Sequence, residues 1–403
     1  MEPLMDYREH RVMTGFARHK PLGRRGFLAG LALALLGGCS IIPKGAPAEA
    51  PPPVRVEPAA TTSNLPDEEG YHRIALLVPL SGENERAGSS IANAATTAVI
   101  DTGAQNIRVT TYDTTPGAAA AAREAMADGN RLILGPLMGE NIDAVAGVAG
   151  QYDVPVISFS NDATQGQRGV FLMGTQPAQS IENTVRYASS RGLRRIAALV
   201  PTGAYGDRAA EGLVSATRAY GATFAGMERY DRGNTSIRSA AMRLRERGGY
   251  DAVLIADGGR LATIAAPVLK PSGSNVQILG TELWSGDDAI YDARALRGAW
   301  FSAVTDERWA QFAQSYAQRF GTRPFRIATL GFDAVLITLN IANDWDVGDE
   351  FPTTRLYGRG GFLGTDGIIR FGSNGIGERA FELREVRANT TEVIEPAPTR
   401  FVD

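Results

Sequence analysis

The chain has 403 residues, 44% of them apolar, and a formal net charge of −3 at neutral pH. It contains one Cys and three His, and His72 is the one His that lies beyond residue 20. These counts exclude a disulfide framework, a Cys metal site and the His-dependent triads and zinc centres of hydrolases. The chain has no G-x-x-x-x-G-K-[ST] motif, which excludes P-loop chemistry. We therefore expect no enzyme, no cofactor and no metal, and the acidic balance argues against nucleic acid as a partner.

Residues 1–38 have the pattern of an export signal. Six basic residues precede an apolar run over 26–36, which is too short to span a bilayer but fits the core of a signal peptide. Arg24 and Arg25, followed by Gly-Phe-Leu, resemble the twin-arginine export signal. We expect this segment to be removed on export.

The next stretch resembles the anchor of a bacterial lipoprotein. Leu36-Gly-Gly-Cys39 is similar to a lipobox, in which the Cys becomes the acylated first residue; a lone buried thiol is the alternative for Cys39. Ser40, in place of Asp, favours the outer membrane by the same resemblance. Seven prolines within 41–70 predict an extended tether. The sequence thus predicts a lipidated Cys and a tether over 39–70, with the folded part in the periplasm.

From residue 71 onward, short apolar runs alternate with helical patterns. Residues 74–78 have no polar interruption, which is typical of a strand covered on both faces. Apolar side chains at helical spacing follow over 89–101. In the same way we expect strands over 108–113, 131–136, 154–159 and 170–173, with helices over 117–128 and 139–150.

The same order of elements starts again at Arg195. We expect strands over 195–200, 223–230, 252–257 and 276–280, with helices over 183–191, 210–217 and 235–247. Strands separated by helices of this length form right-handed crossovers and a parallel sheet. The sequence therefore predicts an α/β protein of two similar lobes, each a parallel sheet flanked by helices.

Beyond Gly298 the pattern changes. We expect a strand over 300–304, helices over 307–320 and 328–342, and an exposed strand over 381–386. The glycine-rich stretch 357–370 matches no phosphate-binding spacing and predicts the tight turns of a β-ribbon.

Taken together, these segments resemble the type I periplasmic binding proteins, in the leucine/isoleucine/valine-binding branch. The resemblance runs over about 70–390 and is carried by Ile74–Gly82, Leu134-Gly-Pro136, Val154–Ser158, Tyr205-Gly206, Phe332–Val335 and Gly361–Gly367. It implies three crossing segments between the lobes, near 175, 300 and 345. Lobe 1 would then comprise 71–175 and 301–343, and lobe 2 would comprise 176–300 and 344–403, with a ligand bound between them by hinge closure.

Candidate binding residues stand where predicted strands end, because ligands bind beyond the carboxyl ends of parallel strands. Ser81 follows the first strand and is a ligand contact or a helix cap. The resemblance implies that amino-acid receptors hold the ligand carboxylate after the third strand, where this chain has Glu140. A glutamate there would repel a carboxylate, unless it faces solvent as a first-turn helix residue.

The resemblance adds further candidates. Ser158, Ser160 and Asn161 lie in the small polar run after the fourth strand. Tyr205 matches a ligand-facing aromatic residue of the second lobe, with packing between the lobe and a loop as the alternative. Asp257 or Glu282 would be the carboxylate that holds an ammonium group, with turn or capping roles as the alternative.

Two functions fit the predicted fold, lipid anchor and candidate binding residues. The chain resembles outer-membrane lipoproteins that activate penicillin-binding proteins, the peptidoglycan synthases, whose domain of this fold has an altered cleft. Glu140, Ser40 and the tether favour that branch. The alternative is a solute-binding receptor of an ABC transporter, which binds an amino acid or a related small ligand and docks to a permease. Ser81 and Tyr205 are compatible with it.

Overall fold

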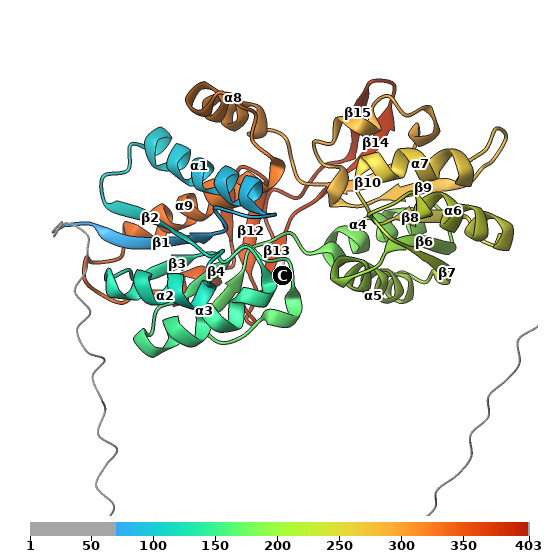
Figure 1. Ribbon diagram of the computed structural model, residues 1–403. Helices are drawn as coiled ribbons and strands as arrows, with labels where there is room; N and C mark the ends of the chain where they lie inside the picture. Colours follow the sequence, from blue (N-terminus) through green and yellow to red (C-terminus); the bar gives the residue numbers. More distant parts are fainter. Residues whose placement is uncertain (1–69, 402–403) are drawn as a thin grey trace, which may run out of the picture. The chain divides into compact units, whose positions relative to one another are not determined.

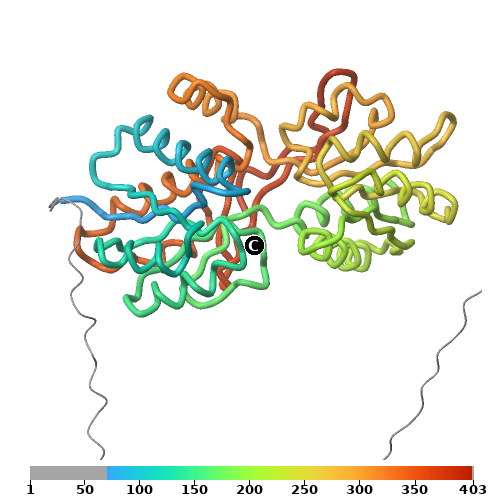
Figure 2. The backbone as a smooth tube through the Cα atoms, in the orientation of Figure 1, coloured from blue at the N-terminus to red at the C-terminus, as the bar shows by residue number. Residues whose placement is uncertain are grey.

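The computed structural model describes residues 70–401. The predictions for the export signal, for Arg24, Arg25 and Cys39, and for the tether up to residue 69 lie outside this part. Residues 70–401 form two α/β lobes (Figure 1; the backbone path is followed in Figure 2). Within them no helix is both long and apolar enough to cross a membrane.

The first lobe contains five parallel strands in the order β2-β1-β3-β4-β5. Ile74 and Leu76 of β1 share a core with α1 and α9, whereas Ala75 and Leu77 face α2 and α3 on the other side. Both faces of the sheet are therefore covered, as its apolar strands predict. The elements are β1 (His72–Val78), α1 (Glu85–Thr102), β2 (Ile107–Asp113), α2 (Ala118–Ala127), β3 (Leu132–Leu134), α3 (Ile142–Ala149), β4 (Val156–Ser158) and β5 (Val170–Leu172).

The second lobe contains a seven-stranded sheet in the order β15-β14-β10-β9-β8-β6-β7. Strands β6 to β10 pair in parallel, and β14 and β15 extend the sheet in antiparallel pairing. Helices α4 and α5 cover one face, and α6 and α7 cover the other. The elements are α4 (Pro177–Ser190), β6 (Arg195–Pro201), α5 (Ala204–Ala219), β7 (Thr223–Tyr230), α6 (Ser236–Arg247), β8 (Ala252–Ile255), α7 (Gly259–Leu269), β9 (Gln277–Gly280), β10 (Trp300–Ala303), β14 (Glu382–Arg387) and β15 (Thr390–Glu395).

The segment between β10 and β14 belongs with the first lobe. Trp345 stacks on His72 with ring centroids 3.9 Å apart, and Phe351 and Ile369 lie in the same core as β1. Ile376 forms a bridge with Leu172 of β5. The segment comprises α8 (Trp309–Phe320), α9 (Thr329–Ala342), β11 (Phe362–Gly364), β12 (Gly367–Phe371) and β13 (Gly377–Arg379), the last three forming the expected antiparallel ribbon.

The third crossing between the lobes therefore lies near residue 380, and the expected position near 345 is wrong. Residues 345–379 return to the first core because their scattered large apolar side chains are buried there, and only then does the chain enter β14. β14 is also largely buried, because it lies between β10 and β15, whereas the sequence predicted an exposed strand over 381–386. The other two crossings lie between β5 and α4 and between β10 and α8.

Both lobes repeat one close contact where a strand passes into a helix. β1 and β6 each run into a proline, Pro79 and Pro201, and the following helix carries a glycine against that proline's carbonyl oxygen. A Cβ added to Gly88 or to Gly206 would lie 1.8 Å from the oxygen. Each helix can therefore approach the end of its strand only because the contact residue has no side chain.

Short 3-10 helices complete the connections. They are η1 (Gly139–Asn141), η2 (Gly150–Tyr152), η3 (Ala163–Gln165), η4 (Glu282–Trp284), η5 (Asp288–Ile290), η6 (Arg294–Leu296), η7 (Arg326–Ala328) and η8 (Thr353–Tyr357).

Candidate functional site

A cavity of about 300 Å3 is lined by residues of both lobes and of the crossings between them. It lies beyond the carboxyl ends of β3, β4 and β9, the edge at which open α/β sheets bind ligands. Its volume is at the lower end of the range for small-molecule sites. Most of the lining is apolar or small, and the full set is Leu137, Phe159, Ser160, Asn161, Gly174, Thr175, Glu282, Leu283, Ser285, Val304, Arg326, Ile327, Thr329, Leu330 and Asp366.

Glu282 is the buried acid of this cavity. It follows β9 and is 8% exposed. Its Oε1 accepts a hydrogen bond from the Tyr205 hydroxyl at 3.0 Å, and its backbone N–H donates to the Ser180 Oγ at 2.9 Å. Its Oε2 has no partner among the described residues. Burial raises the pKa of Glu282 despite these hydrogen bonds.

Replacing Glu282 with glutamine should therefore change the pH dependence of stability. The folded protein holds a proton on Glu282 at a higher pH than the unfolded chain does, so wild-type stability falls as the pH rises above the ordinary glutamate value of 4.5. Glu282→Gln should remove that fall, so the variant gains relative stability between acidic and neutral pH. Urea unfolding at several pH values measures this difference. Parallel pH profiles for the two proteins would contradict it.

Arg208 connects the second lobe to the loop after β4. It lies in α5, and its Nη2 donates to Asn161 Oδ1 at 2.9 Å, while its Nη1 lies 3.2 Å from Asp162 Oδ2. The loop is held by its own serines: Ser158 Oγ accepts the N–H of Ser160 at 3.1 Å, and Ser160 Oγ accepts the N–H of Asp162 at 3.1 Å. Ser158 thus supports the loop, and Ser160 and Asn161 also line the cavity.

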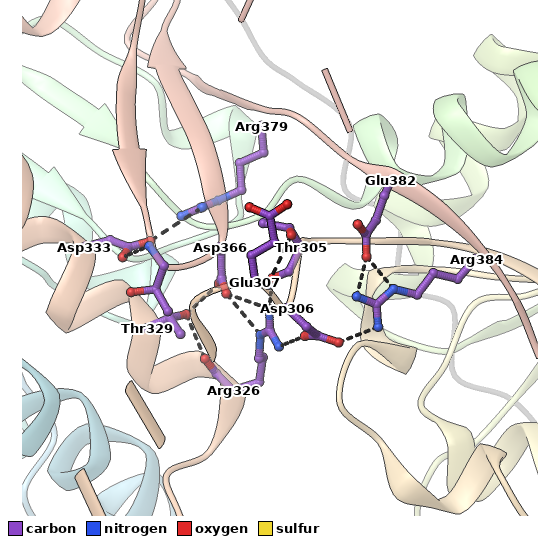
Figure 3. Close-up of polar contacts among 11 residues, drawn as sticks. Thr305, Asp306, Glu307, Arg326, Thr329, Asp333, Asp366, Arg379, Glu382 and Arg384 are labelled. Atoms are coloured by element: carbon purple, nitrogen blue, oxygen red, sulfur yellow. Dashed lines mark hydrogen bonds and ion pairs between the residues drawn. The ribbon is translucent and has the colours of Figure 1, made fainter. Parts of the chain in front are cut away.

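A second polar network lies where the crossings leave the lobes (Figure 3). Arg326 contacts Asp306, reaches Asp366 at 2.8 Å and donates to the Thr305 carbonyl oxygen at 2.8 Å. Asp306 also pairs with Arg384 of β14. Burial opposes ionisation of Asp306, but the two arginines outweigh it and lower its pKa.

This network joins the lobes at the base of the cavity. Arg326 and Asp366 come from the first lobe, Arg384 comes from the second, and Asp306 of the second crossing contacts both arginines. Arg208, Arg326 and Asp366 were not predicted from the sequence. Asp366 lies in the Gly361–Gly367 stretch, which is part of the family resemblance, so the sequence offered a reason to consider it. No sequence feature singles out the two arginines.

Five predicted site residues, among them Ser158 and Tyr205, do not line the cavity. The exposed Ser81 donates to Asp113 Oδ2 at 3.3 Å, and it does not cap α1, whose N-cap is Asn84. Glu140 is exposed in η1. Asp257 is buried and paired with Arg232 at 2.8 Å. The structure therefore brings Ser160, Asn161 and Glu282 to the cavity wall, with Ser158 and Tyr205 behind them. Their binding of a ligand stays a prediction.

Two α/β lobes joined by three crossings, with a cavity between their strand ends, are the architecture of a type I periplasmic binding protein. Residues 72–351, more than half of the chain, match the family model described as periplasmic binding protein. The chain belongs to this family. Family membership indicates a binding protein located in the periplasm or secreted. Within residues 70–401, no group of three His, Cys, Asp or Glu could hold a metal ion.

Solved structures show the same fold at low sequence identity. A putative branched-chain amino acid ABC transporter protein from Rhodospirillum rubrum has a TM-score of 0.70 at 19% identity, covering 80% of this chain and 100% of that one. The leucine-binding protein LivK from Thermotoga maritima gives 0.62 at 17%, covering 81% and 98%. The LpoA C-domain from Haemophilus influenzae, a regulator of PBP1A, gives 0.63 at 18%, covering 80% and 99%. No curated protein matches.

Proposed function

We propose that this chain is a lipid-anchored periplasmic protein that binds a penicillin-binding protein and regulates peptidoglycan synthesis without catalysing a reaction itself. The proposal includes the segments predicted from sequence: a signal peptide over 1–38, acylated Cys39 in the outer membrane, and a tether up to residue 70. A long extended tether lets an anchored domain reach a partner away from its own membrane.

The observation that carries this proposal is that the basic groups beside the cavity are already paired with acids of the same chain. Arg326 is paired with Asp306 and Asp366, and Arg208 with Asp162. A ligand carboxylate needs donors that are not already used, and it would have to displace these acids. This pairing of the basic groups disfavours an amino acid as ligand, so we place the partner contact on a lobe surface.

A solute-binding receptor is the second candidate, and one observation favours it. Glu282 Oε2 is buried without a hydrogen-bond partner among residues 70–401, beside a mostly apolar cavity of about 300 Å3. A buried polar oxygen of this kind is costly unless something donates to it. A small ligand with an N–H or O–H group would satisfy it, and the protein would then serve the permease of an ABC transporter.

Calorimetry distinguishes the two functions. A soluble form that lacks residues 1–39 is titrated with amino acids and small peptides, and separately with the transglycosylase and transpeptidase domains of a penicillin-binding protein. We expect heat of binding from one of the synthase domains and none from the amino acids. Glu282→Gln is the matched control, because it alters the cavity but no exposed surface, and it should leave the synthase affinity unchanged. A micromolar amino-acid signal that is lost in Glu282→Gln would overturn the proposal.

A further inference from the structure

The contact between Arg208 and the loop after β4 joins the lobes through side chains of the protein itself. Asn161 and Asp162 belong to the first lobe, and Arg208 belongs to the second. We propose that this contact is a built-in latch: the Asp162 carboxylate acts as an internal ligand of Arg208 and holds the two lobes together with no small molecule bound. This role goes beyond partner binding and does not depend on it.

On the first-lobe side of the latch, hydrogen bonds within the loop hold the Asp162 side chain in place. Asp162 Oδ1 accepts the backbone N–H of Thr164 at 3.1 Å and its hydroxyl at 2.7 Å, which leaves Oδ2 for Arg208. The serine hydrogen bonds described above fix the backbone on the other side of Asp162. A rigid carboxylate loses little entropy when it pairs, so the contact retains more of its electrostatic energy than a flexible surface pair.

The second-lobe half is equally constrained. Arg208 lies two residues after Gly206, which packs against the Pro201 carbonyl, so the start of α5 is fixed on the end of β6. The side chains of Arg208 and Asp162 are 20% and 22% exposed, and charges that are partly shielded from water attract each other more strongly than fully exposed ones. The buried Nε of Arg208 has no hydrogen-bond partner among the described residues. The guanidinium group therefore makes its contacts through the two Nη atoms, to Asn161 and Asp162.

The latch is a second side-chain contact between the lobes. The network of Arg326 and Asp306 joins the lobes beside the crossings, where a hinge motion moves atoms least. Arg208 and Asp162 form a separate contact near the first crossing, because Gly174 of that crossing packs on Ser160, two residues before Asp162. The two side chains belong to different lobes, so a rotation that moves α5 away from the loop after β4 breaks their contact. The contact therefore favours the arrangement in which the two elements touch.

Electron–electron distance measurements between spin labels test the latch. The full chain carrying Cys39→Ser has no other Cys, so a label pair at Ala120→Cys in α2 and Ser215→Cys in α5, both exposed, reports the distance between the lobes. Without ligand or partner we expect a narrow distribution. Asp162→Asn and Arg208→Ala should each add a longer-distance population and raise the open-to-closed ratio about tenfold, the effect of losing one charge-assisted contact.

The control is Asp207→Asn, which removes the neighbouring ion pair with Arg229 inside the second lobe. It should leave the distribution unchanged. The double variant Arg208→Asp, Asp162→Arg should restore the narrow distribution, which separates a lost latch from general loosening of the fold. Unchanged distances in both Asp162→Asn and Arg208→Ala would overturn the proposal. Because no partner is present, either outcome is independent of whether the protein binds a synthase.

Discussion

Gly206→Ala should lower the free energy of unfolding by about 1–3 kcal/mol, the cost of forcing extra volume into a packed contact. The added Cβ would lie 1.8 Å from the carbonyl oxygen of Pro201 and 2.8 Å from its carbonyl carbon. Both atoms are backbone, so no side-chain rotation relieves the clash, and α5 has to move away from β6. Such a movement also displaces Tyr205 and Arg208, the residues of α5 that contact Glu282 and Asp162. Urea unfolding followed by circular dichroism measures the change.

Gly147→Ala is the matched control. Gly147 lies exposed in α3, and a Cβ there would meet no atom of the described part of the chain within 4 Å. Because glycine in a helix is less stable than alanine by about 0.5–1 kcal/mol, this change should stabilise the protein. Gly88→Ala should repeat the loss in the first lobe, since Gly88 meets the Pro79 oxygen at the same 1.8 Å. If Gly206→Ala and Gly147→Ala changed the free energy of unfolding equally, the contact between α5 and the end of β6 would not limit the size of residue 206.

Arg379→Ala should cost about 3–5 kcal/mol of stability, the range for removing one member of a buried charge pair. Arg379 and Asp333 are almost completely buried, with Arg379 Nη1 3.9 Å from Asp333 Oδ2. Arg379 Nη2 also donates to the carbonyl oxygen of Met173 in the first crossing, at 3.4 Å. The substitution therefore leaves the Asp333 carboxylate uncompensated and removes a contact between two crossings.

The stability lost in Arg379→Ala should also depend on pH. Burial raises the pKa of Asp333 to about 6, with Asp366 adding to the increase and Arg379 opposing it. Without Arg379 the buried carboxyl takes up a proton more readily, and the neutral form costs less to bury. The destabilisation should thus be smaller at pH 5 than at pH 8. Arg387→Ala is the control, because Arg387 is 48% exposed and water screens its pairing with Glu392. A loss no larger than that of Arg387→Ala would contradict the argument.

The sequence predicted the two-lobe fold because its strands and helices carry clear periodicity. The uninterrupted apolar run of β1 and the restart at Arg195 both indicated parallel sheets covered on two faces, and the structure shows them. It did not predict the return of residues 345–379 to the first core. Trp345 and Phe351 are isolated apolar residues in a polar stretch. Isolated residues show neither helical nor strand periodicity, so the sequence does not indicate which core they enter.

The candidate site was predictable only in part, for a related reason. Residues that directly follow a strand can be placed at a strand end from sequence, but Asn161 and Glu282 became candidates through the family resemblance. Both line the cavity. Arg208 and Arg326 lie within or at the start of helices, where arginine is usually a solvated surface residue. Their roles depend on which acids the other parts of the fold bring opposite them, and the chain contains 41 basic residues with no local mark that separates these two.

The insertion of β14 between β10 and β15 has a consequence for biosynthesis. The second sheet lacks two of its strands until residues 382–395 have been made, and the first core lacks Ile369 and Phe371 until shortly before that. Neither lobe is therefore complete before residues 369–395 have been added, although each contains a nearly complete set of earlier strands. A nascent chain that stalls before this point would present the open edge of β10 to chaperones and proteases.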